Sequence, residues 1–236
     1  MSRLLLMAIC LLMAGPLHAV ESADVIVQKM VARDHELVRH RAQYTYTASE
    51  TREKLNEAGD QVLDKTTESM EIRGDKSPDY GTRSGAAAGG GMEGDLKKAS
   101  REEPFNILNI ISHYNFTLVG DEAWNGVPCY KIRFTPKEDQ PYTSREEKVA
   151  NQLAGYLWIE KADYSLLHNT GRLTQPVSVA WFFASVEDLE FSFDTKLLPN
   201  GEFGPSRIQY RFRVSVPFTY IHERHTRNML DYHVTE

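Results

Sequence analysis

The residues best suited to metal chemistry are His222, Glu223 and His225, in a His-Glu-Arg-His segment near the C-terminus. A zinc protease motif needs two histidines four positions apart on a helix and a third ligand from elsewhere, whereas these histidines are three positions apart. The segment lies in a predicted strand, where residues three apart point to opposite faces of a sheet. We therefore expect no metal site here.

Other reactive side chains lack the partners that catalysis needs. Cys129 lies in a predicted strand with no histidine near it in sequence, which favours a small buried apolar residue over a nucleophile. No serine lies in a nucleophile-elbow motif. The acidic pairs 102–103 and 146–147 are typical of solvated surface or of helix starts. We expect neither an enzyme nor a cofactor.

A glycine-rich run at residues 85–91 raises the possibility of a phosphate-binding loop. Such a loop requires a buried strand before it, a helix after it and usually a Lys-Ser or Lys-Thr pair, and none of these is present. Residues 74–98 also contain almost no large apolar side chain. They are predicted to form a flexible loop within one domain, because the segments on either side are each too small to fold alone.

The N-terminus has the three parts of a secretion signal. Arg3 precedes an apolar run at residues 4–14, and Gly15-Pro16 precedes the expected cleavage after Ala19. As a helix the apolar run would rise about 16 Å, roughly half of a bilayer core of about 30 Å, which argues against a permanent anchor. Cys10 follows Ile9 inside the run and is a poor lipidation site. We expect residues 1–19 to be a signal peptide and residues 20–236 to be a single exported domain.

Composition narrows the classes of partner. After signal cleavage Cys129 would be the one remaining thiol, so the fold must be stabilised by packing and not by an internal disulfide. The formal net charge of −6, one unit more negative without Arg3, argues against nucleic acid as a partner. Since no later apolar run approaches spanning length, we expect peripheral or transient membrane contact at most.

Hydrophobic periodicity predicts a mainly β (α+β) fold that consists of one large antiparallel sheet. Helical spacing at residues 23–39 predicts an amphipathic helix, and a second helix is expected at about 104–114. Alternating patterns predict strands at about 44–48, 62–72, 116–123, 129–135, 153–160, 165–173, 189–193, 208–216 and 218–227. The apolar face of this sheet must be covered by helices or by the sheet's own curvature, as in a barrel or half-barrel.

Aromatic side chains are the candidates for a binding site. Residues 181–183 are three consecutive large aromatics, which cannot all point to one face of a strand. If the sheet is a half-barrel, the side chains expected around its cavity are Tyr156, Trp158, Trp181, Phe183, Phe191, Tyr210 and Phe212. The alternative is that these residues fill a core.

Two segments resemble the LolA-like family of bacterial outer-membrane lipoprotein-sorting proteins. They are WNGVPCYKIRFTPK at residues 124–137 and GYLWIEKADY at residues 155–164, where the family has a turn-strand pattern ending near Pro-Lys and a strand with an apolar-Trp-Ile-acidic-Lys pattern. The family implies a curved, incomplete β-barrel closed by one or two helices, with an apolar cavity that shelters acyl chains in the periplasm. The first strand, AQYTYT at residues 42–47, lacks the family's Phe-rich motif, which puts lipoprotein as the ligand in doubt.

The resemblance and the aromatic pattern together predict a non-catalytic periplasmic carrier. Its expected partners are lipid or the acyl chains of lipoproteins. Because RseB-like regulators share the scaffold, the alternative is an envelope protein-interaction or stress-sensor module that binds a protein partner.

Overall fold

The structure is a computed structural model and describes residues 21–73, 111–179 and 184–235. Four predictions concern segments outside these ranges: the signal peptide, the glycine-rich loop, most of the helix expected at 104–114, and the aromatic triplet at 181–183. Among the described residues, Tyr114 opens a strand where the second helix was expected to end. No described helix is long and apolar enough to cross a membrane.

Helix α1 (Ala23–Arg41) forms where the sequence predicts it and extends two residues further. The Ser22 hydroxyl caps its N-terminus by accepting a hydrogen bond from the backbone N–H of Val25. Basic residues in the last turn complement the negative end of the helix dipole. The buried face consists of Ala23, Ile26, Val27, Met30 and Leu37, and such an apolar stripe on one side is typical of an amphipathic helix.

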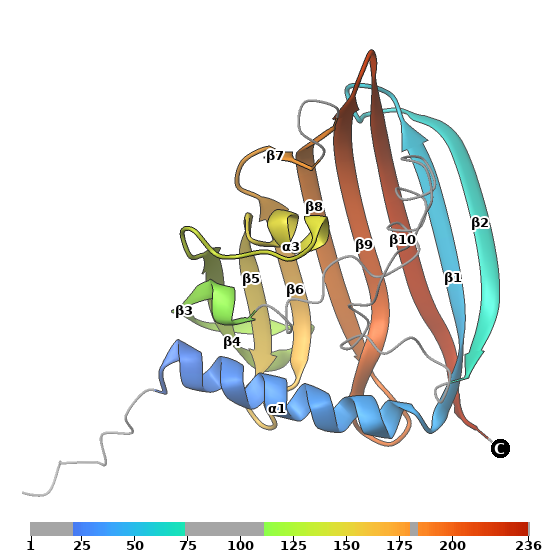
Figure 1. The fold of residues 1–236 in the computed structure, drawn as a ribbon. Coiled ribbons are helices and arrows are strands. Elements are labelled where there is room, and N and C mark those ends of the chain that lie inside the picture. Colours follow the sequence, from blue (N-terminus) through green and yellow to red (C-terminus); the bar gives the residue numbers. More distant parts are fainter. Residues whose placement is uncertain (1–20, 74–110, 180–183, 236) are drawn as a thin grey trace, which may run out of the picture.

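In the described part of the chain, ten antiparallel strands form one sheet (Figure 1). The strands are β1 (Tyr44–Leu55), β2 (Val62–Arg73), β3 (Tyr114–Trp124), β4 (Val127–Pro136), β5 (Leu153–Glu160), β6 (Leu166–Leu173), β7 (Val177–Ser178), β8 (Ser185–Leu197), β9 (Phe203–Val216) and β10 (Thr219–Val234). Their order is β2-β1-β10-β9-β8-β6-β5-β4-β3, with β7 paired to β8. Since β2 and β3 do not pair, the sheet is a curved, incomplete barrel, and the predicted mainly β fold class is confirmed.

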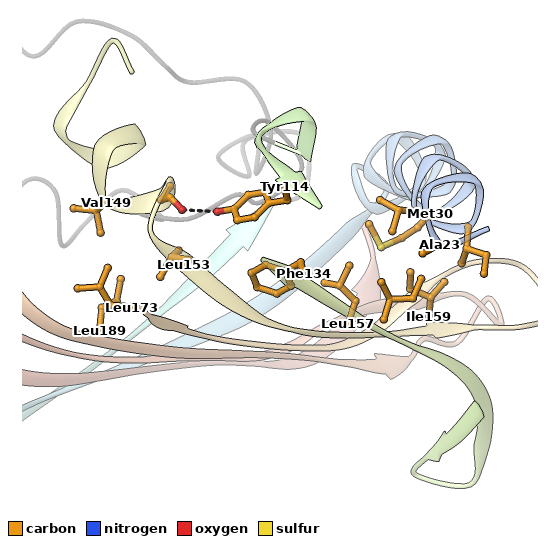
Figure 2. Close-up of a cluster of buried hydrophobic side chains, with 14 of the residues drawn as sticks. Ala23, Met30, Tyr114, Phe134, Val149, Leu153, Leu157, Ile159, Leu173 and Leu189 are labelled. Carbon is orange, nitrogen blue, oxygen red and sulfur yellow. Dashed lines mark hydrogen bonds between the residues drawn. The ribbon is translucent and has the colours of Figure 1, made fainter. Parts of the chain in front are cut away.

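Two helices of the described residues cover one half of one face of the sheet, which we call the inner face. Helix α1 and the short helix α3 (Arg145–Ala150) pack over β3 to β8, and their apolar side chains meet those of the sheet (Figure 2). The sheet side of this core includes Phe134, Leu157, Ile159 and Leu189. The hydroxyl of Tyr114 donates a hydrogen bond of 2.5 Å to the carbonyl oxygen of Ala150 and joins β3 to α3. Helix α3 was not predicted as an element; the acidic pair at 146–147 lies in its first turn.

Helix α1 is held to the sheet by ion pairs at two strand-to-strand turns. The guanidinium of Arg33 lies 3.1 Å from Asp163 in the β5–β6 turn and 3.4 Å from Glu202 in the β8–β9 turn. Beside this junction, burial and then the hydrogen bond and negative charge of Asp163 raise the pKa of Glu160 to about 7. The folded chain therefore holds a proton on Glu160 at pH values where the unfolded chain releases it.

Stability is expected to fall as pH rises between about 4.5 and about 7, because this raised pKa stabilises the fold fully below the ordinary value of 4.5 and not above 7. The variant E160Q removes the titration and should be more stable than the parent above about pH 7, by less than ~1 kcal/mol because the site is partly solvated. Urea midpoints measured at about pH 5 and about pH 8 test this. An equal displacement of the midpoint at both pH values would contradict it.

Candidate functional site

Three of the seven predicted binding residues lie together on the inner face. Phe191 of β8 is registered with Tyr210 of β9, and Phe212 of β9 is registered with Leu189 of the core. Phe191 and Phe212 pack against the helix-covered core, and the rings of Tyr210 and Phe212 stack with centroids 6.2 Å apart. All three aromatic rings are half-buried. We call Phe191, Tyr210 and Phe212 the aromatic strip.

Tyr156 and Trp158 lie on the opposite, outer face, so they share no surface with the aromatic strip. Side chains alternate along β5, and it is Leu157 and Ile159 that enter the core under α1. Trp158 instead packs in a small outer cluster with Cys129 and Leu167. The structure therefore does not bring Tyr156 and Trp158 to the face of the sheet that contains the aromatic strip. Trp181 and Phe183 lie outside the described residues.

A pair of opposed glycines forms the floor beside the aromatic strip. Gly155 of β5 is registered with Gly171 of β6, and Gly171 is registered with Phe191. A β-carbon on Gly171 would lie 2.6 Å from Cζ of Phe191 and 3.2 Å from Cζ of Phe134. The absence of a side chain at Gly171 therefore leaves the space that the Phe191 ring occupies, next to Phe134 of the core.

Charged side chains continue the inner face beyond the strip, on β10 and β1. Glu50 accepts two hydrogen bonds of 2.9 Å from Arg52 and one of 3.1 Å from Arg227. Burial alone would raise the pKa of Glu50, but the hydrogen bonds and charges of the two arginines outweigh it and hold the pKa below its ordinary value. A carboxylate with two guanidinium partners remains ionised and keeps both arginines in place.

His225 connects this charged surface to the aromatic strip. Its ring is buried, its Nε2 lies 2.8 Å from Oε2 of Glu223, and its Nδ1 lies 3.1 Å from the Tyr210 hydroxyl. Because an ionised carboxylate only accepts, Nε2 donates to Glu223. This hydrogen bond lowers the pKa of Glu223 despite partial burial. We call Glu50, Arg52, Glu223, His225 and Arg227 the charged row.

The charged row was not predicted, although the sequence contains a signal for it. Tyr46, Ala48, Glu50 and Arg52 occupy alternating positions of β1 and therefore share one face. Along this series the residues change from apolar to charged in the middle of the strand. Such a change predicts that the inner face becomes polar part of the way along.

The two histidines of the His-Glu-Arg-His segment point to opposite faces of β10, as the sequence predicted. His225 is registered with Tyr210 on the inner face, and His222 is registered with Arg213 on the outer face. The ring of His222 packs under the β1–β2 turn, where Gly59 has a φ of 78° and leaves room for it. Within the described ranges no group of three potential ligands is close enough to hold a metal ion.

Cys129 is fully buried in the outer cluster, which agrees with its predicted structural role. Burial raises the pKa of its thiol, and a protonated thiol is a weak nucleophile. The same face contains the ring of His168, stacked on Trp124 at 3.7 Å and hydrogen-bonded to Asp194 at 2.7 Å. These contacts account for the outer cluster as a second, smaller core.

The inner face thus combines an apolar floor, an aromatic strip and a row of paired charges, over which an amphiphilic molecule can lie. These features make the inner face the candidate binding surface of the half-barrel.

Comparison with known proteins gives structural matches alone. No family model and no curated protein matches the chain. A similar solved structure is a DUF1329 family protein from Desulfovibrio piger, with 11% identity, a TM-score of 0.40, and coverage of 91% of this chain and 93% of that one. A putative outer membrane lipoprotein-sorting protein domain from Vibrio parahaemolyticus has 12% identity, a TM-score of 0.40, and coverage of 88% and 93%. A LolA superfamily protein from Nitrosomonas europaea has 12% identity, a TM-score of 0.36, and coverage of 92% and 94%. The LolA-like resemblance that the two sequence segments indicated therefore recurs among the matched structures.

Proposed function

We propose that this chain is a non-catalytic binding or carrier protein of the periplasm, which holds lipidated or otherwise hydrophobic cargo on the inner face of its half-barrel. The observation that carries the proposal is the aromatic strip. Its three rings are half-buried in the folded chain, at the border between the helix-covered core and the charged row. Covering this exposed apolar surface with another apolar group removes it from water and lowers the free energy.

An amphiphile fits this arrangement better than a purely apolar or a purely ionic ligand. Burying an acyl chain contributes about 0.8 kcal/mol per CH₂, which requires no polar chemistry from the protein. The polar end of the molecule would lie toward the charged row, where the paired charges of Glu50 and Arg52 are already organised. The proposed ligand contacts are Phe191, Tyr210 and Phe212, together with Trp181 and Phe183 from the sequence analysis.

The test is the binding of anthroyloxy-labelled stearate to purified protein, measured by fluorescence. The variant F212S removes one ring of the strip and is expected to weaken binding about tenfold or more, since burial of a phenylalanine side chain is worth roughly 2 kcal/mol. The matched control is Y156S, an aromatic of the same sheet that is 37% exposed on the outer face. It should bind the probe as the parent does.

Absence of probe binding at saturation would contradict the proposal. An equal loss of stearate binding in F212S and Y156S would also contradict it, because the binding site would then not lie on the inner face.

A polypeptide partner is the second candidate, and the charged row favours it. Five charged or titratable groups on one face are more than an acyl chain needs, and they suit a partner with complementary charge. This envelope protein-interaction module would show a stoichiometric protein cross-link in whole cells and no binding of labelled stearate.

A further inference from the structure

The tip of the β9–β10 hairpin combines two unfavourable features at one residue. Val216 is paired with Thr219, so the turn consists of Pro217 and Phe218 alone. Phe218 has a φ of 70°, and its side chain is 107% exposed. In a turn that begins with proline, a second position with positive φ is normally glycine or asparagine, because a bulky side chain is strained there.

Neither feature stabilises the folded chain in water. The backbone strain would be relieved by asparagine or glycine at position 218, and no apolar side chain of the described residues covers the exposed ring. Strained backbone of this kind persists where it serves a function. The phenylalanine is thus suited to an apolar medium outside the protein.

We propose that Phe218 dips into the surface of a lipid bilayer and holds the hairpin end of the sheet against it. The β9–β10 hairpin ends in a narrow tip at one end of the sheet (Figure 1), and Phe218 is the exposed aromatic residue of its two-residue turn. A stable protein interface needs about 800 Å² from each partner, which such a tip does not offer, whereas a fluid bilayer closes around a single side chain.

The residues next to the tip are of the types found at the level of the lipid headgroups. Tyr220 is 44% exposed, and the guanidinium of Arg213 lies 4.2 Å from the centroid of its ring. An aromatic ring with a polar hydroxyl and a long cationic side chain are both typical of membrane interfaces. Arg213 also lies 3.6 Å from Glu57, so this end of the sheet does not depend on excess positive charge. Binding should therefore occur on uncharged lipid and resist salt.

The experiment measures co-sedimentation of the purified protein with vesicles of phosphatidylcholine and phosphatidylethanolamine. The variant F218N is expected to bind about tenfold more weakly, because it lacks the ring that enters the lipid. It should also melt higher, by about 2–4 °C, because asparagine accepts the positive φ. If F218N binds vesicles more weakly and melts at a higher temperature, then Phe218 serves membrane binding and not the stability of the fold.

The matched control is L197N. Leu197 is 63% exposed and lies at the end of β8 that pairs with Phe203, away from the β9–β10 turn. It should sediment with vesicles as the parent does, and F218W should retain binding. The inference does not rest on the proposed cargo, because F218N is expected to bind labelled stearate normally.

Four results would overturn the inference: no sedimentation of the parent protein, equal sedimentation of F218N and the parent, equal loss in L197N, or a lower melting temperature for F218N. A parent dimer that F218N converts to a monomer would also overturn it, since the tip would then contact a second copy of the chain.

Discussion

Replacement of Gly155 by alanine is expected to destabilise the fold by at least ~3 kcal/mol. A β-carbon at this position would overlap the carbonyl oxygen of Thr170 and would lie 2.7 Å from Cα of Gly171. Both are backbone atoms of the neighbouring strand β6, so neither can move aside without breaking the β5–β6 pairing. A loss of this size is a large part of the 5–15 kcal/mol that usually stabilises a folded domain.

The matched control for G155A is G126A. Gly126 has a φ of 84° in the β3–β4 turn, with no atom within 4 Å of where a β-carbon would lie. Its substitution incurs backbone strain alone, about 1–2 kcal/mol. Urea unfolding of both variants, followed by circular dichroism, measures the difference. If G155A were no less stable than G126A, the close approach of β5 and β6 would be wrong.

Replacement of Phe134 by alanine is expected to reduce stability by about 3–5 kcal/mol, because it leaves a cavity in the centre of the helix-covered core. Phe134 is completely buried, and its ring meets Tyr114 edge-on with centroids 5.3 Å apart. It also supports the floor of the candidate site, close to Gly171. We therefore expect F134A to weaken the binding of labelled stearate as well.

The control for F134A is F116A. Phe116 is registered with Phe134 across β3 and β4, but it lies on the edge strand and is only partly buried. Its loss removes less contact and should reduce stability by about 1–2 kcal/mol. Chemical denaturation of both variants under the same conditions gives the comparison. Similar values for the two substitutions would mean that the core does not centre on Phe134.

The strands were predictable because a strand with one buried face shows a local alternation of apolar and polar residues in the sequence. The prediction for 153–160 coincides with β5 (Leu153–Glu160), and those for 62–72 and 129–135 fall within two residues of β2 and β4. The later strands were placed correctly but are longer, since β9 begins at Phe203 and β10 continues to Val234. Their ends contain fewer alternating apolar residues, and long-range pairing extends them.

The candidate site was only partly predictable, for a reason visible in β5. The sequence Gly-Tyr-Leu-Trp-Ile places aromatic residues on one face of the strand and aliphatic residues on the other. Either face can enter a core, so alternation by itself does not identify the inner one. The structure places Leu157 and Ile159 inside because helix α1 packs on that side. For Phe191, Tyr210 and Phe212 the aromatic face is the inner one.

The sequence by itself determined helix α1, most of the strands, the mainly β fold class and the opposite orientation of His222 and His225, because each depends on a period of two or 3.6 residues. Tertiary structure decided the rest. It set which face of each strand the helices cover and brought Glu50 of β1 to Arg227 of β10. These outcomes depend on the pairing of segments far apart in the chain, which no local pattern of residues specifies.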